Sequence, residues 1–351
     1  GGKLVDETLD PDEVLKGTLV PVLISERPKK IPIAVEWPEI VYREPESAFA
    51  FAINGQTIYL HNTSITLVNR EDSGPLSFGI TTDELTVGFE IELIERGDAP
   101  DYVIRKTDGT NASINHRSRS MSLQEFFEEQ PPTFWFADGS SLTGVEYVEL
   151  RRQPEPFPRD RIEVWDWKGT NIRTESQGIR RDPHSVQFRV IQELTKRNLA
   201  VIFDDDDQGE SADVVGIAEL ADHIEVEFWH CKYASEDRPG ARIKELYELC
   251  GQAQKSVRWL EQPRDLFTHL LRREPRNFKG ASGTRFELGT VKDVLRIREK
   301  ADIQRVLLRI YIVQPGLSKA QASREQLELL AVTENYLMET LAVPFAAVAS
   351  S

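Results

Sequence analysis

Residues 199–233 read LAVIFDDDDQGESADVVGIAELADHIEVEFWHCKY, and this stretch decides the expected fold of the second half of the chain. It contains apolar runs of strand length at residues 199–203, 213–218 and 224–233. Four aspartates follow the first run, and the second and third runs are close enough in sequence to form a hairpin. The stretch therefore predicts three neighbouring strands of one sheet.

The segments around this stretch complete an α/β pattern. Asp182 and Pro183 are typical of a helix start, with Asp182 as N-cap, and apolar residues then recur at helical spacing up to Leu194. A helix, a strand, a second helix and a second strand are expected further along, at about residues 241–260, 306–313, 324–341 and 345–348. This order predicts an α/β domain with a central mixed sheet over residues 156–351, ending in a helix-strand extension.

The first half of the chain is expected to be β-rich. Short apolar runs such as residues 48–53 are bounded by turn signals such as Asn54-Gly55, and residues 86–94 largely alternate apolar with polar side chains. We predict a β-sandwich or barrel-like module over residues 1–155, whose sequence carries no recognisable chemistry. The Pro- and Arg-rich residues 151–160 are expected to link the two parts, so that the whole is an α+β/α/β protein.

Composition limits the class of protein. The chain has 351 residues, 40% of them apolar, which suits two or three folded domains and excludes a wholly disordered chain. Its apolar runs are too short for a membrane span, and no leader sequence opens it. Cys231 and Cys250 are too few for a disulfide framework, so reduced thiols and a cytoplasmic location are expected. The formal charge of −15 argues against coating nucleic acid over the whole surface.

Candidate chemistry lies where the second and third strands meet. Alternate side chains share one face of a strand, so His230 and Lys232 lie together and Cys231 points the other way. If the two strands pair as a hairpin, Asp213 lies beside Lys232. A carboxylate there could hold a divalent metal while the ammonium orients an attacking water. Mg²⁺ is the expected ion, with Mn²⁺ as the alternative, because oxygen ligands and phosphate substrates suit it.

The second half of the chain resembles the PD-(D/E)xK restriction-endonuclease-like superfamily. More closely, it is similar to the nuclease-like domain attached to bacterial DEAD/DEAH-box helicases of defence-type loci. The stretches that carry this resemblance are DDDDQGESAD (204–213), HCKYA (230–234), PGARIKELYELCGQAQKSVRW (239–259) and VQPGLSK (313–319).

The resemblance implies roles for particular residues. Asp213 matches the metal-binding aspartate of the superfamily and Lys232 its catalytic lysine. His230 stands where the superfamily usually has an acid, and it would assist as a polar or proton-shuttling group. Because imidazole suits softer metals than Mg²⁺, a further carboxylate is needed, and Glu210 or one of Asp204 to Asp207 is nearby.

Three further residues are supporting candidates. Gln187 lies on the apolar face of the first predicted helix, where related nucleases often place an acid, and Glu175 precedes that helix. Gln252, in the helix after the third strand, could line the same groove.

A basic region follows the candidate site. Residues 238–305 contain sixteen Lys or Arg against nine Asp or Glu, an excess of seven. The densest group within this region, and the predicted contact to backbone phosphates, is Arg272, Arg273, Arg276 and Lys279. Such contacts would make DNA binding salt-dependent and largely independent of base sequence.

The expected function is that of a metal-dependent DNA endonuclease, the effector of a helicase-associated anti-phage or restriction-type system. The chain has no GxxxxGK[ST] loop, so a helicase motor in the same polypeptide or a separate subunit would deliver the DNA. Two other functions stay open: a degenerate nuclease fold that binds DNA or docks the motor, and a protein-interaction scaffold. Asp213 and Lys232 would then form a strand-edge ion pair, and the four aspartates a solvated turn.

Overall fold

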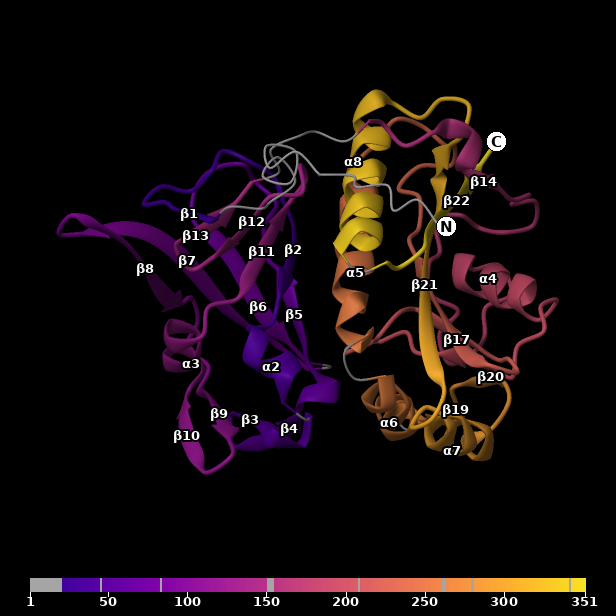
Figure 1. Cartoon of the computed structure of the whole chain (residues 1–351), viewed down its shortest axis with the longest axis horizontal. Coiled ribbons are helices and arrows are strands. Elements are labelled where there is room, and N and C mark those ends of the chain that lie inside the picture. The colour runs from indigo at the N-terminus through magenta and orange to yellow at the C-terminus, as the bar shows by residue number, and fades with distance from the viewer. Residues whose placement is uncertain are drawn as a thin grey trace, which may run out of the picture.

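In the computed structural model, the chain forms two lobes that lie side by side (Figure 1). The N-terminal lobe runs from β1 (Pro21–Leu23) to β13 (Glu146–Val148), and the C-terminal lobe from β14 (Glu163–Val164) to β22 (Phe345–Ser350). The structure describes residues 21–44, 46–82, 84–149, 155–207, 209–260, 263–278, 281–340 and 342–351. Residues 151–154 of the predicted linker lie outside these ranges.

The N-terminal lobe is built mainly of strands. Between its first and last strands lie β2 (Pro32–Glu36), α2 (Glu39–Arg43), β3 (Phe49–Ile53), β4 (Gln56–Tyr59), β5 (Ser64–Leu67), β6 (Leu76–Thr81), β7 (Thr86–Arg96), β8 (Ala99–Lys106), β9 (Ala112–His116), β10 (Arg119–Ser122), α3 (Leu123–Glu129), β11 (Thr133–Phe136) and β12 (Ser141–Thr143).

Three antiparallel sheets form this lobe in the described residues, with the orders β1-β13-β12-β11-β2, β10-β9-β3-β4 and β5-β6-β7-β8. They enclose one aromatic core, in which the rings of Phe78 and Phe89 pack edge-on against Phe127 at centroid distances of 5.1 and 5.2 Å. Edge-to-face packing is a favoured arrangement of aromatic rings, and here it joins α3, which carries Phe127, to the sheet that contains β6 and β7.

The C-terminal lobe alternates helices and strands. After β14 come α4 (Val186–Leu194), β15 (Val201–Asp204), β16 (Val214–Glu219), β17 (His223–Cys231), α5 (Lys244–Lys255), α6 (Pro263–Arg273), β18 (Pro275–Phe278), β19 (Ala281–Thr284), β20 (Phe286–Leu288), α7 (Val291–Lys300), β21 (Arg305–Ser318) and α8 (Arg324–Asn335).

The central sheet of this lobe is mixed. Its strand order in the described residues is β14-β22-β21-β17-β16-β15-β20, seven strands in all. β17 pairs antiparallel with β16 and parallel with β21. The predicted mixed α/β architecture and the β16–β17 hairpin are therefore confirmed. The structure also differs from the prediction: Ser185, not Asp182, caps α4, and the elements β14, α6, β18, β19, β20 and α7 were not foreseen.

Alternation along β17 separates the two faces of the sheet. Val226 and Phe228 belong to the core formed with α5, α6, α7 and α8, whereas Trp229 and Cys231 belong to the core formed with α4. His230 therefore shares the face of α5, as the period-two pattern predicts. Figure 1 shows α5 and α8 on the side of the sheet that faces the N-terminal lobe.

The two lobes share packing at α5. Ile33 and Ala34 of β2 belong to the core of the C-terminal lobe. Gly251 lies so close to β2 that a Cβ atom there would be 2.6 Å from the carbonyl oxygen of Ile33. Lys255 donates a hydrogen bond from Nζ to the carbonyl oxygen of Ile65 at 3.0 Å. α5 is thus held on both sides, by its own sheet and by the first lobe. Among the described residues, no helix is both long enough and apolar enough to cross a membrane.

Candidate metal centre

Three carboxylates gather at the end of β15 and the start of β16. The chain leaves β15 at Asp204, passes through a loop and enters β16 directly after Asp213. One oxygen from each of Asp206, Glu210 and Asp213 lies within 4.8 Å of the other two. Asp213 is buried, and its Oδ2 accepts the backbone N–H of Cys231 at 2.9 Å, which fixes it against β17. We call Asp206, Glu210 and Asp213 the acid trio.

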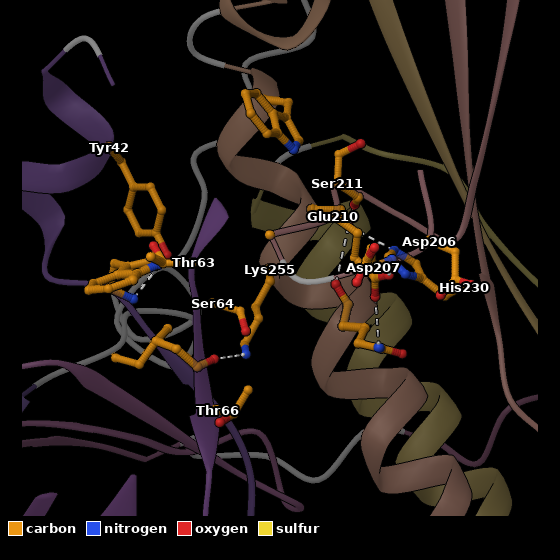
Figure 2. Close-up of a pocket in the computed structure, with 16 residues that line it drawn as sticks. Tyr42, Thr63, Ser64, Thr66, Asp206, Asp207, Glu210, Ser211, His230 and Lys255 are labelled. Carbon is orange, nitrogen blue, oxygen red and sulfur yellow. Dashed lines mark hydrogen bonds between the residues drawn. The ribbon is translucent and has the colours of Figure 1, made fainter. Parts of the chain in front are cut away.

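The acid trio borders a cavity between the lobes. The cavity has a volume of about 440 Å³, and Asp206, Glu210 and His230 line it from the C-terminal lobe. Figure 2 shows these side chains on one wall and Thr63, Ser64 and Thr66 of the N-terminal lobe on the other, with Lys255 reaching between them. The β-rich lobe therefore supplies one wall of the candidate site, a role that its sequence did not suggest.

The electrostatics of the acid trio favour a bound cation. Burial, with the neighbouring Asp206 carboxylate, raises the pKa of Glu210 to about 8. Burial and the nearby carboxylates of Glu210, Asp206 and Glu175 also raise the pKa of Asp213 well above its usual range. Like charges that crowd in this way resist ionisation, and a divalent cation between them would remove that cost.

Lys232 lies next to the trio but does not pair with Asp213. Its Nζ is 3.0 Å from Oε2 of Glu248 and 3.3 Å from Oε2 of Glu175. Burial lowers the pKa of Lys232, but these two carboxylates outweigh burial and raise it above its ordinary value. The side chain is therefore an ammonium at neutral pH. Glu175 takes the place of Asp213 as the partner of Lys232. Its carboxylate raises the pKa of both Lys232 and Asp213.

The supporting candidates divide into two kinds. Glu175 and Gln252 both lie at the site: Glu175 pairs with Lys232, and Gln252 donates from Nε2 to Oε1 of Glu210 at 3.3 Å. The Oε1 of Gln252 is buried and has no hydrogen-bond partner. Gln187 instead donates to Oδ1 of Asp204 at 2.9 Å and to the carbonyl oxygen of Asp213 at 3.1 Å. Gln187 therefore links Asp204 and Asp213, the residues at the two ends of the loop.

His230 is buried and neutral. Its side chain lines the cavity although the residue is only 2% exposed, and Nε2 lies 2.7 Å from Oγ of Ser256. Nδ1 is buried without a hydrogen-bond partner. Burial lowers the pKa of His230 to about 3, so this imidazole is a weak proton acceptor at neutral pH. This environment does not favour the proton-shuttling role that we expected from the sequence.

One member of the predicted phosphate-binding group is not at the surface. Arg273 is buried, and its Nε donates to Oδ1 of Asp205 at 2.5 Å, because Asp205 is itself a fully buried carboxylate that needs a counter-charge. Arg272 lies in the last turn of α6 and is exposed. Arg276 lies in β18, and Lys279 lies outside the described residues. Elsewhere in the basic region, Arg296 and Lys300 both pair with Glu219.

Two neighbours of the site make contacts that the sequence did not predict. Glu248 pairs with Lys232, and Asp205 anchors the loop that carries Asp206. Glu248 had a signal, since it lies four residues before Gln252 and so shares its face of α5. Asp205 had none, because a run of four aspartates does not indicate which carboxylate turns inward.

Comparisons with known proteins identify no family, since no family model, no curated protein and no solved structure matches the chain. The class that the fold defines is a mixed α/β protein with a seven-stranded mixed sheet in its described part. The site adds a carboxylate cluster and a paired lysine at the ends of neighbouring strands.

Proposed function

We propose that the chain is a divalent-metal-dependent nuclease that hydrolyses phosphodiester bonds of DNA. The observation that carries this proposal is the acid trio, whose oxygens lie within 4.8 Å of one another beside a cavity between the lobes. A second observation supports it: His230 lines the same cavity with a buried, unpartnered Nδ1. Clusters of this kind, with a lysine nearby, suit phosphoryl chemistry.

The donor set fits Mg²⁺ or Mn²⁺. Asp206, Glu210 and Asp213 offer only carboxylate oxygens, which are the ligands these hard cations prefer. The unpartnered Oε1 of Gln252 adds a neutral oxygen donor beside Glu210. A cation held there would neutralise the crowded carboxylates and stabilise negative charge on a bound phosphate.

Lys232 contributes a fixed positive charge. Because Glu175 and Glu248 keep it protonated, it acts by binding and orienting, as an ammonium donates hydrogen bonds to a phosphate oxygen or to the attacking water. Removal of a proton from that water falls to a neighbouring carboxylate, and Glu175 is the acid that pairs with Lys232 and also lies close to Asp213. The water oxygen then bonds to phosphorus as the bond to the leaving sugar oxygen breaks.

The delivery of DNA is proposed on the resemblance alone. The stretches that resemble nuclease-like domains of bacterial defence helicases suggest that a helicase motor, in the same polypeptide or as a separate subunit, brings DNA to the cleft. In that setting the chain is the effector of an anti-phage or restriction-type system.

One observation favours a second candidate function, a degenerate nuclease fold that binds DNA or docks a motor. His230 stands where the superfamily has an acid, and it is buried, neutral and bonded to Ser256. If the acid trio cannot replace that missing carboxylate, the fold would bind without cutting.

A cleavage assay separates the two candidates. Supercoiled and linear DNA are incubated with the protein in Mg²⁺, in Mn²⁺ and in chelator, for the wild type, Asp213→Asn and Lys232→Met. The matched control is Asp222→Asn, an aspartate whose side chain is 87% exposed. We expect metal-dependent cleavage that both site variants lose and the control keeps. DNA binding without cleavage in either metal would leave the degenerate fold as the function.

A further inference from the structure

The buried side chain of Asp205 joins the two ends of the loop that carries Asp206 and Glu210. Oδ2 of Asp205 accepts the backbone N–H and the Oγ–H of Ser211, both at 2.7 Å. Asp206 directly follows Asp205, and Glu210 directly precedes Ser211. The two loop carboxylates of the acid trio therefore flank the point at which the loop is tied together.

Arg273 of α6 binds the same aspartate, Asp205. Its Nε donates to Oδ1 of Asp205 at 2.5 Å, and its Nη2 donates to the carbonyl oxygen of the same residue at 2.7 Å. Nη2 also lies 3.4 Å from the carbonyl oxygen of Asp207, within the loop. One guanidinium thus binds both the side chain and the backbone of the loop, and such a planar fork restricts its partner in orientation as well as in distance.

Arg285 forms further hydrogen bonds to the backbone at the start of the loop. Its Nη1 donates to the carbonyl oxygens of Asp204 at 3.1 Å and Asp206 at 2.8 Å, and its Nε donates to the carbonyl oxygen of Arg273 at 2.8 Å. Both arginines are at least nine-tenths buried. These hydrogen bonds join the two arginines to the loop backbone and to Asp205, and the charge of Arg273 also acts on the nearby Glu210 carboxyl.

We propose that Arg273 and Asp205 are positioning residues, which hold Asp206 and Glu210 at the separation that a divalent metal needs. The inference rests on the proposed metal centre and adds a role to residues outside it. It also gives Arg273 a role in place of the phosphate contact expected from the sequence. Loss of groups that orient metal ligands usually lowers metal affinity by about 10- to 100-fold.

The test compares Mn²⁺ affinity with thermal stability. Mn²⁺ binding is titrated by electron paramagnetic resonance, which detects the free ion, in the wild type, in Arg273→Met and in the double variant Asp205→Asn/Arg273→Met. The control is Arg197→Met, which breaks a half-buried pair with Glu227 on the α4 face of the sheet. Melting temperature and hydrogen exchange of residues 205–211 are measured on the same proteins.

We expect Arg273→Met to lose about 10- to 100-fold in Mn²⁺ affinity and to exchange faster in the loop. The double variant should recover melting temperature, because no unpaired charge stays buried, yet keep the weaker affinity. Arg197→Met should lose stability at unchanged affinity. Wild-type affinity in Arg273→Met, or affinity that follows melting temperature in all variants, would overturn the positioning role. A wild type that binds no Mn²⁺ would overturn the metal centre itself and this role with it.

Discussion

The ammonium of Lys232 lies 3.0 Å from Oε2 of Glu248, so the lysine at the end of β17 is tied to a carboxylate of α5. Glu175 pairs with the same ammonium from the loop before α4, at 3.3 Å. Two carboxylates from different segments of the chain therefore set the position of Lys232 and keep it charged. α5 in turn packs against the N-terminal lobe, so the position of Lys232 depends on both halves of the chain.

The Glu248→Gln variant tests this dependence. Glu248 is outside the acid trio, so we expect Mn²⁺ affinity to stay within about twofold of the wild type. DNA cleavage should fall by roughly 10- to 100-fold, because the ammonium loses the partner that orients it. The measurement is single-turnover cleavage at saturating metal, with Glu328→Gln in α8, a partly exposed glutamate that pairs with Arg324, as control. Unchanged cleavage would show that Glu175 alone positions Lys232.

The raised pKa of Glu210 predicts how stability depends on pH. Its pKa is about 8 in the folded protein against 4.5 when unfolded, so the folded state binds the proton more tightly. The free energy of unfolding therefore falls as pH rises from about 4.5 to about 8, and this contribution is constant above that range. We expect the melting temperature of the metal-free protein to drop across this window and the drop to be smaller in Glu210→Gln.

Bound metal should reverse this loss of stability at high pH, which gives a second measurement on Glu210. Mg²⁺ or Mn²⁺ binds the ionised carboxylates, so it should raise the melting temperature more at pH 8 than at pH 6. An equal rise at both pH values, or none in the wild type, would argue against a metal among these acids.

His230 is expected to contribute little to the pH dependence of cleavage. With its pKa lowered to about 3 by burial, the imidazole is neutral across the range in which the assay runs. His230→Gln should therefore keep the shape of the pH–rate profile between about pH 5 and 9, whatever its effect on the maximal rate. Loss of an ionisation from that profile in His230→Gln would restore the proton-shuttling role.

The contact between the lobes is tested by Gly251→Ala. The new Cβ atom would lie 2.6 Å from the carbonyl oxygen of Ile33 and 2.9 Å from Cβ of Ala34. Overpacking costs about 1–3 kcal/mol, and the better helix propensity of alanine returns about 1 kcal/mol. We expect a net loss of up to about 2 kcal/mol in urea denaturation, whereas Gly109→Ala, with open space around it, should stay within about 0.5 kcal/mol.

Much of the C-terminal lobe could be predicted because its pattern is local. Apolar runs and turn signals located β15, β16 and β17, and period-two alternation placed His230 on the α5 face. Residues 261–304 were not resolved into elements. They do contain apolar residues at helical spacing, such as Leu266, Phe267 and Leu270 of α6, but these lie among many charged side chains. Asp182 was predicted as N-cap because Pro183 after it suits the first helical position, whereas the structure has Ser185 as the cap.

The sequence predicted only those members of the site that lie close to one another along the chain. Asp213, Glu210 and Lys232 do lie near one another, but the partners of Lys232 come from distant segments. Arg273 lies 68 residues from Asp205, and only tertiary packing brings them into contact. A charge run in the sequence does not distinguish an arginine that faces solvent from one that neutralises a buried carboxylate.

The most direct test of the central claim is the metal dependence of DNA cleavage in Asp206→Asn. Single-turnover cleavage of supercoiled DNA is measured as Mg²⁺ concentration rises, for the variant and for the wild type. We predict that the wild-type rate saturates with Mg²⁺ and that the variant needs at least about tenfold more metal to reach half its maximal rate. Absence of cleavage by the wild type at any Mg²⁺ or Mn²⁺ concentration, or the same half-saturation in both proteins, would contradict the account.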